Sequence, residues 1–201
     1  PLGSDVSEIV VTGPGGPDVA SIDDLSGKEV HVRASSSYAE HLKALNQRFA
    51  SEGKAPVQLV DADEVLEDGD LLEMVAAGLI PATVVDNFMV DLWAKVFPAL
   101  KPHPEAALAT GSQIAWAFRK DSPKLAETIN GFVKTQKQGT AAGNILINKY
   151  LKNAKWVKNA RSDEDIARFR SMIDLFRKYS DQYKFDWLLM AAQCYQGSGL
   201  D

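Results

Sequence analysis

The stretch that decides the fold of this chain runs Glu29-Val-His-Val-Arg-Ala-Ser-Ser-Ser-Tyr-Ala-Glu-His-Leu-Lys-Ala-Leu45. Its first part alternates valine with histidine, which is typical of a half-buried strand. After the serine run, Leu42 and Leu45 share one face of a predicted helix with Tyr38. A serine at this junction is a good N-cap, and the free backbone amides of a first helical turn can also hold an anion. The stretch alone leaves both interpretations open.

Composition limits the class of protein. The 201 residues are 45% hydrophobic and 24% charged, which is typical of a globular protein with a sizeable core. The net charge of −5 argues against a nucleic-acid binder, and no apolar run approaches the ~20 residues of a membrane span. One cysteine, Cys194, excludes an internal disulfide, and three scattered histidines predict no metal site. The loop Gly13–Pro17 has prolines and no following Lys-Ser/Thr, so we expect no nucleotide and no cofactor.

The first half of the chain alternates strand and helix patterns, which predicts a parallel α/β layer. The acidic residues between 61 and 70 fit helix starts better than a calcium loop, because that loop lacks its glycine. Residues 1–4 read as the remnant of a cleaved tag and are set aside. The predicted strands cover 8–12, a segment from Glu29, 57–60, 81–86 and 113–119, with 101–110 irregular.

The second half is predicted to be mainly helical. Helices are expected at 123–138, 141–151 and 163–184, and another begins at 186. Basic residues recur every third position from Lys149 to Arg161, which favours a solvated face over a surface for an anionic polymer.

Two segments resemble known families. Residues 18–140, with the run from Ser21 to Val30 and the triplet Val84-Val85-Asp86, resemble the later part of family 3 solute-binding proteins. Residues 179–201 resemble the opening of the soluble lytic transglycosylase domain, whose motif reads Ala-Ala-Gln-x-Tyr-Gln-Glu-Ser-x-Leu-Asp. The pair, in this order, resembles membrane-bound lytic murein transglycosylases of the F type.

The resemblance implies an α/β fold. We expect a sheet lobe of the type II periplasmic-binding-protein kind, followed by helices that begin a lysozyme-like domain. The expected boundaries are 5–158 for the solute-binding-like domain, mainly its second lobe with the first lobe incomplete, and 162–201 for the start of the transglycosylase domain. Relative to the family the chain is expected to be truncated at both ends. The parent protein would be periplasmic and associated with the outer membrane.

The resemblance also implies a ligand site. Ser36 and Ser37 match positions that hold a ligand carboxylate, with Arg33 nearby, and Asp86 matches the carboxylate that pairs with an α-ammonium group. From the residues alone, Asp86 is equally well a helix N-cap. The implied ligand is an amino acid or a peptidoglycan stem peptide.

The catalytic position of the transglycosylase motif is changed. The family uses one glutamic acid of raised pKa to protonate the glycosidic oxygen, and here that position is Gly197. Ser198 is too weak an acid to replace it. We therefore expect no catalytic residue and no lytic activity, although the parent family would act on peptidoglycan.

Other functions stay open at this point. The chain could be a stand-alone module that senses an amino acid or muropeptide, or the binding protein of a transport system. We further expect self-association, because the strand predicted at 113–119 is apolar on both faces and strand edges at 8–12 and 113–119 would be unpaired. A compact monomer, with the helices folded over these surfaces, is the alternative.

Overall fold

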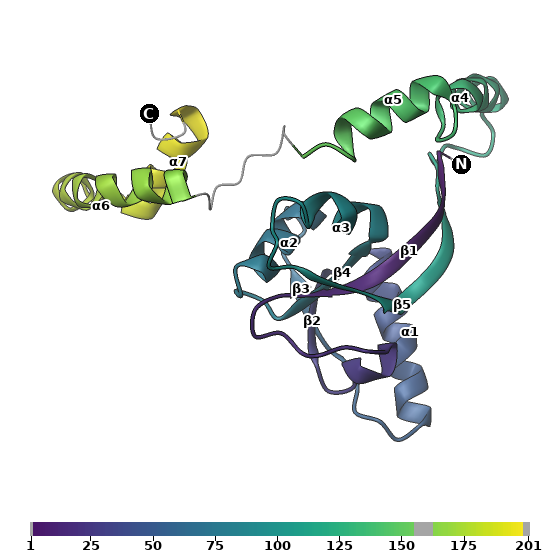
Figure 1. The fold of residues 1–201 in the computed structure, drawn as a ribbon, viewed down its shortest axis with the longest axis horizontal. Coiled ribbons are helices and arrows are strands. Elements are labelled where there is room, and N and C mark those ends of the chain that lie inside the picture. Colours follow the sequence, from purple (N-terminus) through teal and green to yellow (C-terminus); the bar gives the residue numbers. More distant parts are fainter. Residues whose placement is uncertain (1, 155–162, 199–201) are drawn as a thin grey trace. The chain divides into compact units, whose positions relative to one another are not determined.

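The computed structural model of the protein describes residues 2–154 and 163–198, the second range with side chains from Ala167 onward. It divides into two compact units, residues 1–156 and 157–201, which are described separately (Figure 1). None of the described helices combines the length and the apolar character needed to cross a bilayer.

The first unit is built on a five-stranded mixed sheet of order β3-β2-β4-β1-β5. β2 pairs in parallel with both β3 and β4, as the alternating strand and helix pattern predicted. β1, however, runs antiparallel to β4 and to β5. The strands are β1 (Gly3–Thr12), β2 (Glu29–Arg33), β3 (Gln58–Ala62), β4 (Ala82–Asp86) and β5 (Lys101–Ile114).

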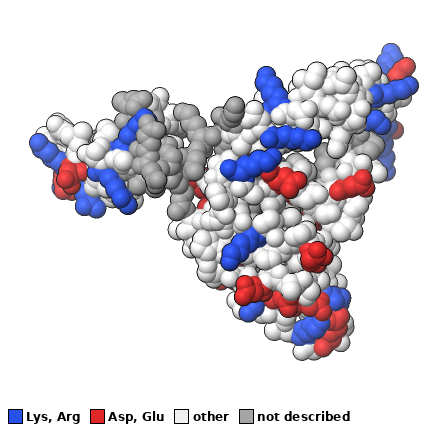
Figure 2. Space-filling model, in the orientation of Figure 1, with Lys and Arg blue, Asp and Glu red and all other residues white. Residues whose placement is uncertain are grey.

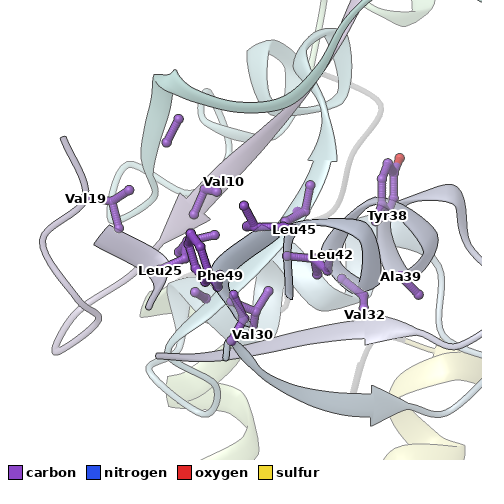
Figure 3. Packing of buried hydrophobic residues seen from close by; sticks show 14 residues of the cluster. Val10, Val19, Leu25, Val30, Val32, Tyr38, Ala39, Leu42, Leu45 and Phe49 are labelled. Carbon is purple, nitrogen blue, oxygen red and sulfur yellow. The ribbon is translucent and has the colours of Figure 1, made fainter. Parts of the chain in front are cut away.

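Helices cover both faces of this sheet. On one face lie η1 (Ile22–Leu25) and α1 (Ser37–Ser51), whose Leu42 and Phe49 are fully buried against alternate residues of β1, β2 and β4 (Figure 3). On the other face, α2 (Asp68–Ala76) and α3 (Asn87–Trp93) form a second apolar cluster with the opposite residues of β1 and β4. Each such large side chain contributes about 1.5–3 kcal/mol when it is fully buried.

The sequence prediction was wrong for β1 and β5. β5 covers 101–114, where an irregular segment was expected, and it ends where a strand over 113–119 was predicted. β5 contains prolines at 102 and 104, but it is an edge strand, and an edge tolerates proline because its missing amide faces no partner. β1 starts at Gly3, inside the segment that had been set aside, because it pairs along β5 as far as Ile114. With neighbours on both sides, β1 is not an unpaired edge.

Two further helices complete the first unit. α4 (Pro123–Gln136) and α5 (Ala141–Tyr150) lie where helices were predicted; α4 starts with proline in its first turn, and the Thr140 hydroxyl caps α5. α4 buries none of its residues. The Trp116 ring stacks on Phe132 with centroids 5.8 Å apart, and both side chains stay about half exposed.

Charged side chains of both signs are interspersed on the surface shown in Figure 2. Near the end of α1, for example, the Asp23 carboxylate accepts hydrogen bonds from Arg48 at 2.5 Å and Lys54 at 2.6 Å. These two bonds lower the pKa of Asp23. Such exposed pairs contribute little to stability because water and salt screen them.

The second unit holds α6 (Asp163–Tyr183) and α7 (Trp187–Ser198). They meet through a small core of Phe176 and Ala191, and Phe169 stacks on Trp187 with centroids 6.2 Å apart. The side chain of Asp186 accepts from the amides of residues 188 and 189, which caps α7 where the sequence predicted a helix start. The first side chains of the helix predicted at 163–184 and most of the predicted basic repeat lie outside the described side chains.

Candidate ligand-binding site

The predicted site residues lie at the carboxyl ends of β2 and β4. These two strands are neighbours, yet the helices that follow them, α1 after β2 and α3 after β4, pack on opposite faces of the sheet. Open α/β sheets bind ligands at such a change of direction, because the connecting loops separate there. Arg33 ends β2, Ser36 and Ser37 begin α1, and Asp86 ends β4, so the fold brings all four to one edge of the sheet.

Ser36 is used for helix capping. Its hydroxyl accepts a hydrogen bond from the Ala39 amide at 3.2 Å and donates one to the Arg33 carbonyl at 2.7 Å. The residue has the extended backbone of an N-cap. The serine run was interpreted either as a helix N-cap or as an anion site, and the structure shows the N-cap, at Ser36.

Ser37 contacts a carboxylate of the protein itself. Its hydroxyl donates to Glu8 Oε1 at 2.7 Å, and His41 Nδ1, one turn further along α1, lies 2.6 Å from Glu8 Oε2. Glu8 belongs to β1 and is only 4% exposed. Sequence reasoning missed both Glu8 and His41. The sequence does contain one indication of Glu8: it is a charged residue directly before the apolar residues Ile9–Val11, and in a strand it points to the same face as the buried Val10.

Arg33 is also engaged within the chain. Its guanidinium donates to Asp68 Oδ1, at the start of α2, at 2.8 Å. The Tyr38 hydroxyl donates to the other oxygen of Asp68 at 3.2 Å and accepts from the Asp86 backbone amide at 3.3 Å. Burial, followed by the charges of Asp68 and Asp86, raises the pKa of Tyr38 well above its usual range. This network connects the ends of β2 and β4 to the starts of α1 and α2.

Asp86 has the most perturbed carboxyl group of the site. Burial, followed by the nearby charges of Glu8 and Asp68, raises its pKa to about 6, and a hydrogen bond with Tyr38 partly opposes the rise. Glu8 is its direct cross-strand partner, which places two acidic side chains on one face of the sheet. The Asp86 side chain makes no capping hydrogen bond to α3, so the alternative that it serves as a side-chain N-cap is not supported.

The acidic run serves helix ends and turns. The Asp70 side chain accepts from the Glu67 amide at 2.7 Å at the start of α2. Glu64 accepts from the Ser35 amide at 3.0 Å and from the Ser35 hydroxyl at 2.5 Å, and these bonds lower the pKa of Glu64. Across the described residues, no three His, Cys, Asp or Glu side chains come together in a group that could hold a metal ion.

A cleft of about 1080 Å³ lies next to the polar cluster. It is bounded by the start of β1, by α3, by the end of β5 and by α4 and α5, and Asn87, the residue after Asp86, is part of its lining. Asp91 of α3 and Lys95, two residues after this helix ends, contribute charges to it. The four predicted site residues, Arg33, Ser36, Ser37 and Asp86, do not line this cleft.

Gly197, the position matched to the catalytic glutamic acid, lies on α7. It is exposed, and a Cβ placed there would meet no atom within 4 Å in the described structure. The Ser198 hydroxyl donates to the Cys194 carbonyl at 3.1 Å, so it is used within its own helix. Cys194 is free and exposed.

Comparison by sequence finds similar proteins along most of the chain. No protein-family model matches it. A protein named membrane-bound lytic murein transglycosylase F from Pseudomonas fluorescens (strain Pf0-1) is 29% identical over 182 residues, covering 87% of this chain and 35% of the relative. A protein of the same name from Maricaulis maris (strain MCS10) is 28% identical over 220 residues, covering 100% of this chain and 43% of the relative. The chain thus spans less than half the length of these relatives.

Comparison by structure finds amino-acid binding proteins. An ancestral arginine-binding protein bound to arginine superimposes with a TM-score of 0.58 at 22% identity, covering 75% of this chain and 62% of that protein. A second solved structure is a substrate-binding protein of an amino acid ABC transporter from Streptococcus pneumoniae, bound to L-arginine. It superimposes with a TM-score of 0.60 at 19% identity, covering 76% of this chain and 59% of that protein. At these identities the likeness concerns the fold. By sequence the chain is similar to proteins named membrane-bound lytic murein transglycosylase F, and its fold is that of the type II periplasmic binding proteins.

Proposed function

We propose that the chain is a regulatory, solute-binding-like part of a peptidoglycan-cleaving lytic transglycosylase, and that it binds an amino acid or a peptidoglycan stem peptide at Asp86. One observation carries the binding proposal: a partly buried carboxylate of raised pKa lies where open α/β sheets bind ligands. Within the described residues, no lysine, arginine or histidine forms an ion pair with Asp86. The ammonium group of a ligand would supply that missing charge.

The similar proteins support this function over the alternatives. Solved proteins of this fold are described as bound to arginine, to glutamine and to lysine. The sequence relatives share one name, lytic murein transglycosylase, across nearly the whole chain, including its helical end. A stand-alone sensor or a transport protein is compatible with the fold, but neither accounts for that end of the chain.

The domain assignment is part of the same proposal. Residues 5–158 form the solute-binding-like domain, and residues 162–201 correspond to the start of a lysozyme-like transglycosylase domain. The separation of contacts into units at residues 156 and 157 supports a boundary there. The names of the relatives support a periplasmic, membrane-associated parent protein.

Calorimetry against an amino-acid panel tests the binding site. Wild type is expected to bind weakly, and Asp86→Ala is expected to abolish binding because it removes the partner of the ammonium group. Asp91→Ala is the matched control, since Asp91 is an exposed carboxylate of α3 that lines the adjacent cleft. Submicromolar binding that survives Asp86→Ala would place the site elsewhere.

We also propose that this chain has no lytic activity, because Gly197 carries no proton donor. Purified peptidoglycan is incubated with the chain, and the products are analysed by mass spectrometry. No anhydromuropeptides are expected, and Gly197→Glu alone should not restore activity, because a catalytic acid also needs a positioned substrate. Release of anhydromuropeptides at enzyme-like rates by the wild type would contradict this proposal.

Self-association is the remaining part of the proposal. Large apolar side chains stay about half exposed around α4, namely Trp116, Leu125 and Phe132. Contiguous apolar surface of this kind favours contact with another molecule. Light scattering after size exclusion is expected to give a mass above that of the monomer at high protein concentration. A monomer mass at every accessible concentration would rule self-association out.

A further inference from the structure

We infer that Glu8 determines which ligands this site accepts: it fills the place of a ligand carboxylate, so the site favours primary amines that carry no adjacent carboxylate over free amino acids. This inference rests on the proposed binding site at Asp86 and names the chemical class of its ligand. It rests on three observations, namely the occupied start of α1, the occupied arginine and the balance of charge.

The start of α1 is already occupied by an internal carboxylate. Both oxygens of Glu8 are held there, one by the Ser37 hydroxyl at 2.7 Å and the other by His41 Nδ1 at 2.6 Å. The Glu8 side chain is only 6% exposed. The first turn of a helix attracts one anion through its free amides and its dipole. A ligand carboxylate at this place would have to displace Glu8 and leave it buried without its two partners.

The other groups that could bind a carboxylate are occupied as well. The Arg33 guanidinium holds Asp68 at 2.8 Å and lies 3.7 Å from Glu67. The Ser36 hydroxyl is used by the helix cap and by the Arg33 carbonyl. Among the described residues at this edge, the side chains suited to bind a carboxylate, Arg33, Ser36 and Ser37, are therefore already paired with the chain itself.

The charge balance of the site points the same way. Three buried or partly buried carboxylates, Glu8, Asp68 and Asp86, lie at this edge of the sheet with two basic groups, Arg33 and His41, and the exposed Glu67 adds a further negative charge beside Arg33. A ligand carboxylate would add a fourth negative charge in a partly buried place, where like charges repel more strongly than in water. An ammonium group beside Asp86 would instead balance the excess. The site is thus more complementary to an amine than to a zwitterion, which is consistent with the weak binding expected for amino acids.

Matched ligand pairs test this inference. Calorimetry near neutral pH compares agmatine with arginine and isopentylamine with leucine, since each pair differs only by the α-carboxylate. Wild type is expected to bind the amine of each pair at least about tenfold more tightly, a difference of about 1.4 kcal/mol. Glu8→Gln replaces the internal carboxylate by a neutral amide, which a ligand carboxylate can displace from Ser37 and His41 more easily, and should bring the two ligands of each pair to within about threefold.

Glu29→Gln is the control variant. Glu29 also pairs with a histidine, His31 at 2.6 Å, but it lies at the opposite end of β2 and its side chain is 46% exposed. This variant should keep the full preference for amines. Folding of each variant is checked by circular dichroism. The comparison of amine and amino-acid affinities for the wild-type protein tests the inference even if a variant fails to fold.

Two results would overturn the inference while the proposed site survives. One is an amino acid that binds wild type as tightly as its amine. The other is a preference for amines that is unchanged in a folded Glu8→Gln protein. If no ligand of either pair binds, or if binding survives Asp86→Asn, the proposed site itself is wrong, and the inference fails with it.

Discussion

Replacing Asp86 by asparagine should stabilise the first unit at neutral pH, and the gain should disappear in acid. Burial and the neighbouring carboxylates raise the pKa of Asp86 from 3.8 to about 6, so the folded protein holds this proton more strongly than the unfolded chain does. The favourable contribution of the protonated carboxyl is complete below the unfolded pKa of 3.8, and it is lost as the pH rises through about 6. Asparagine stays neutral throughout and avoids that loss.

The size of the gain follows from the same pKa. The difference between 3.8 and about 6 corresponds to about 3 kcal/mol, at about 1.4 kcal/mol for each tenfold change in proton affinity. Asp86 is only partly buried, so solvent screens a good part of this energy, and we expect about 1–2 kcal/mol at neutral pH. The substitution removes no capping hydrogen bond, because the Asp86 side chain makes none to α3.

Urea unfolding of both proteins between about pH 4 and pH 8 measures this effect. Hydrogen exchange of peptides from β1 and β4 then reports the stability of the sheet separately from that of the rest of the chain. Asp91→Asn, on the exposed side of α3, is the control and should change the free energy of unfolding by less than about 0.5 kcal/mol at every pH. The reasoning is refuted if Asp86→Asn destabilises the sheet at neutral pH, or if its effect is the same at both ends of the pH range.

Three further substitutions test the packing. Gly69→Ala places a methyl group 2.3 Å from the Trp93 ring. Because the ring has to move, the substitution should lower the free energy of unfolding by about 1–3 kcal/mol in urea denaturation. An unchanged free energy of unfolding would mean that the ring moves aside without cost. Gly131→Ala in α4 meets no neighbouring atom and should raise stability by about 0.5–1 kcal/mol in the same assay, whereas a loss would contradict the open space around it. Phe49→Ala empties a fully buried position of α1 and should cost about 3–5 kcal/mol in thermal unfolding, and a cost below about 1 kcal/mol would show that the core refills.

Local patterns in the sequence were sufficient for most elements of the fold. The alternation in β2, the serine cap of α1 and the apolar face with Leu42 all concern residues within a few positions of one another. Side-chain periodicity and capping act over such short distances, so they can be deduced without the tertiary structure. The same short patterns located Arg33 at the end of β2 and Asp86 at the end of β4, and the parallel pairing of these strands placed them at one edge.

Only the tertiary structure decided what the site residues contact. Glu8 and Ser37 are separated by 29 positions, and Arg33 and Asp68 by 35, so no local pattern connects them. The contact between Glu8 and Ser37 depends on β1 lying antiparallel beside β4, and the contact between Arg33 and Asp68 joins the end of β2 to the start of α2. The position of β5 at the edge likewise made its prolines acceptable in a strand. Strand pairing and buried charge pairs join distant parts of the chain, and for this reason they required the folded structure.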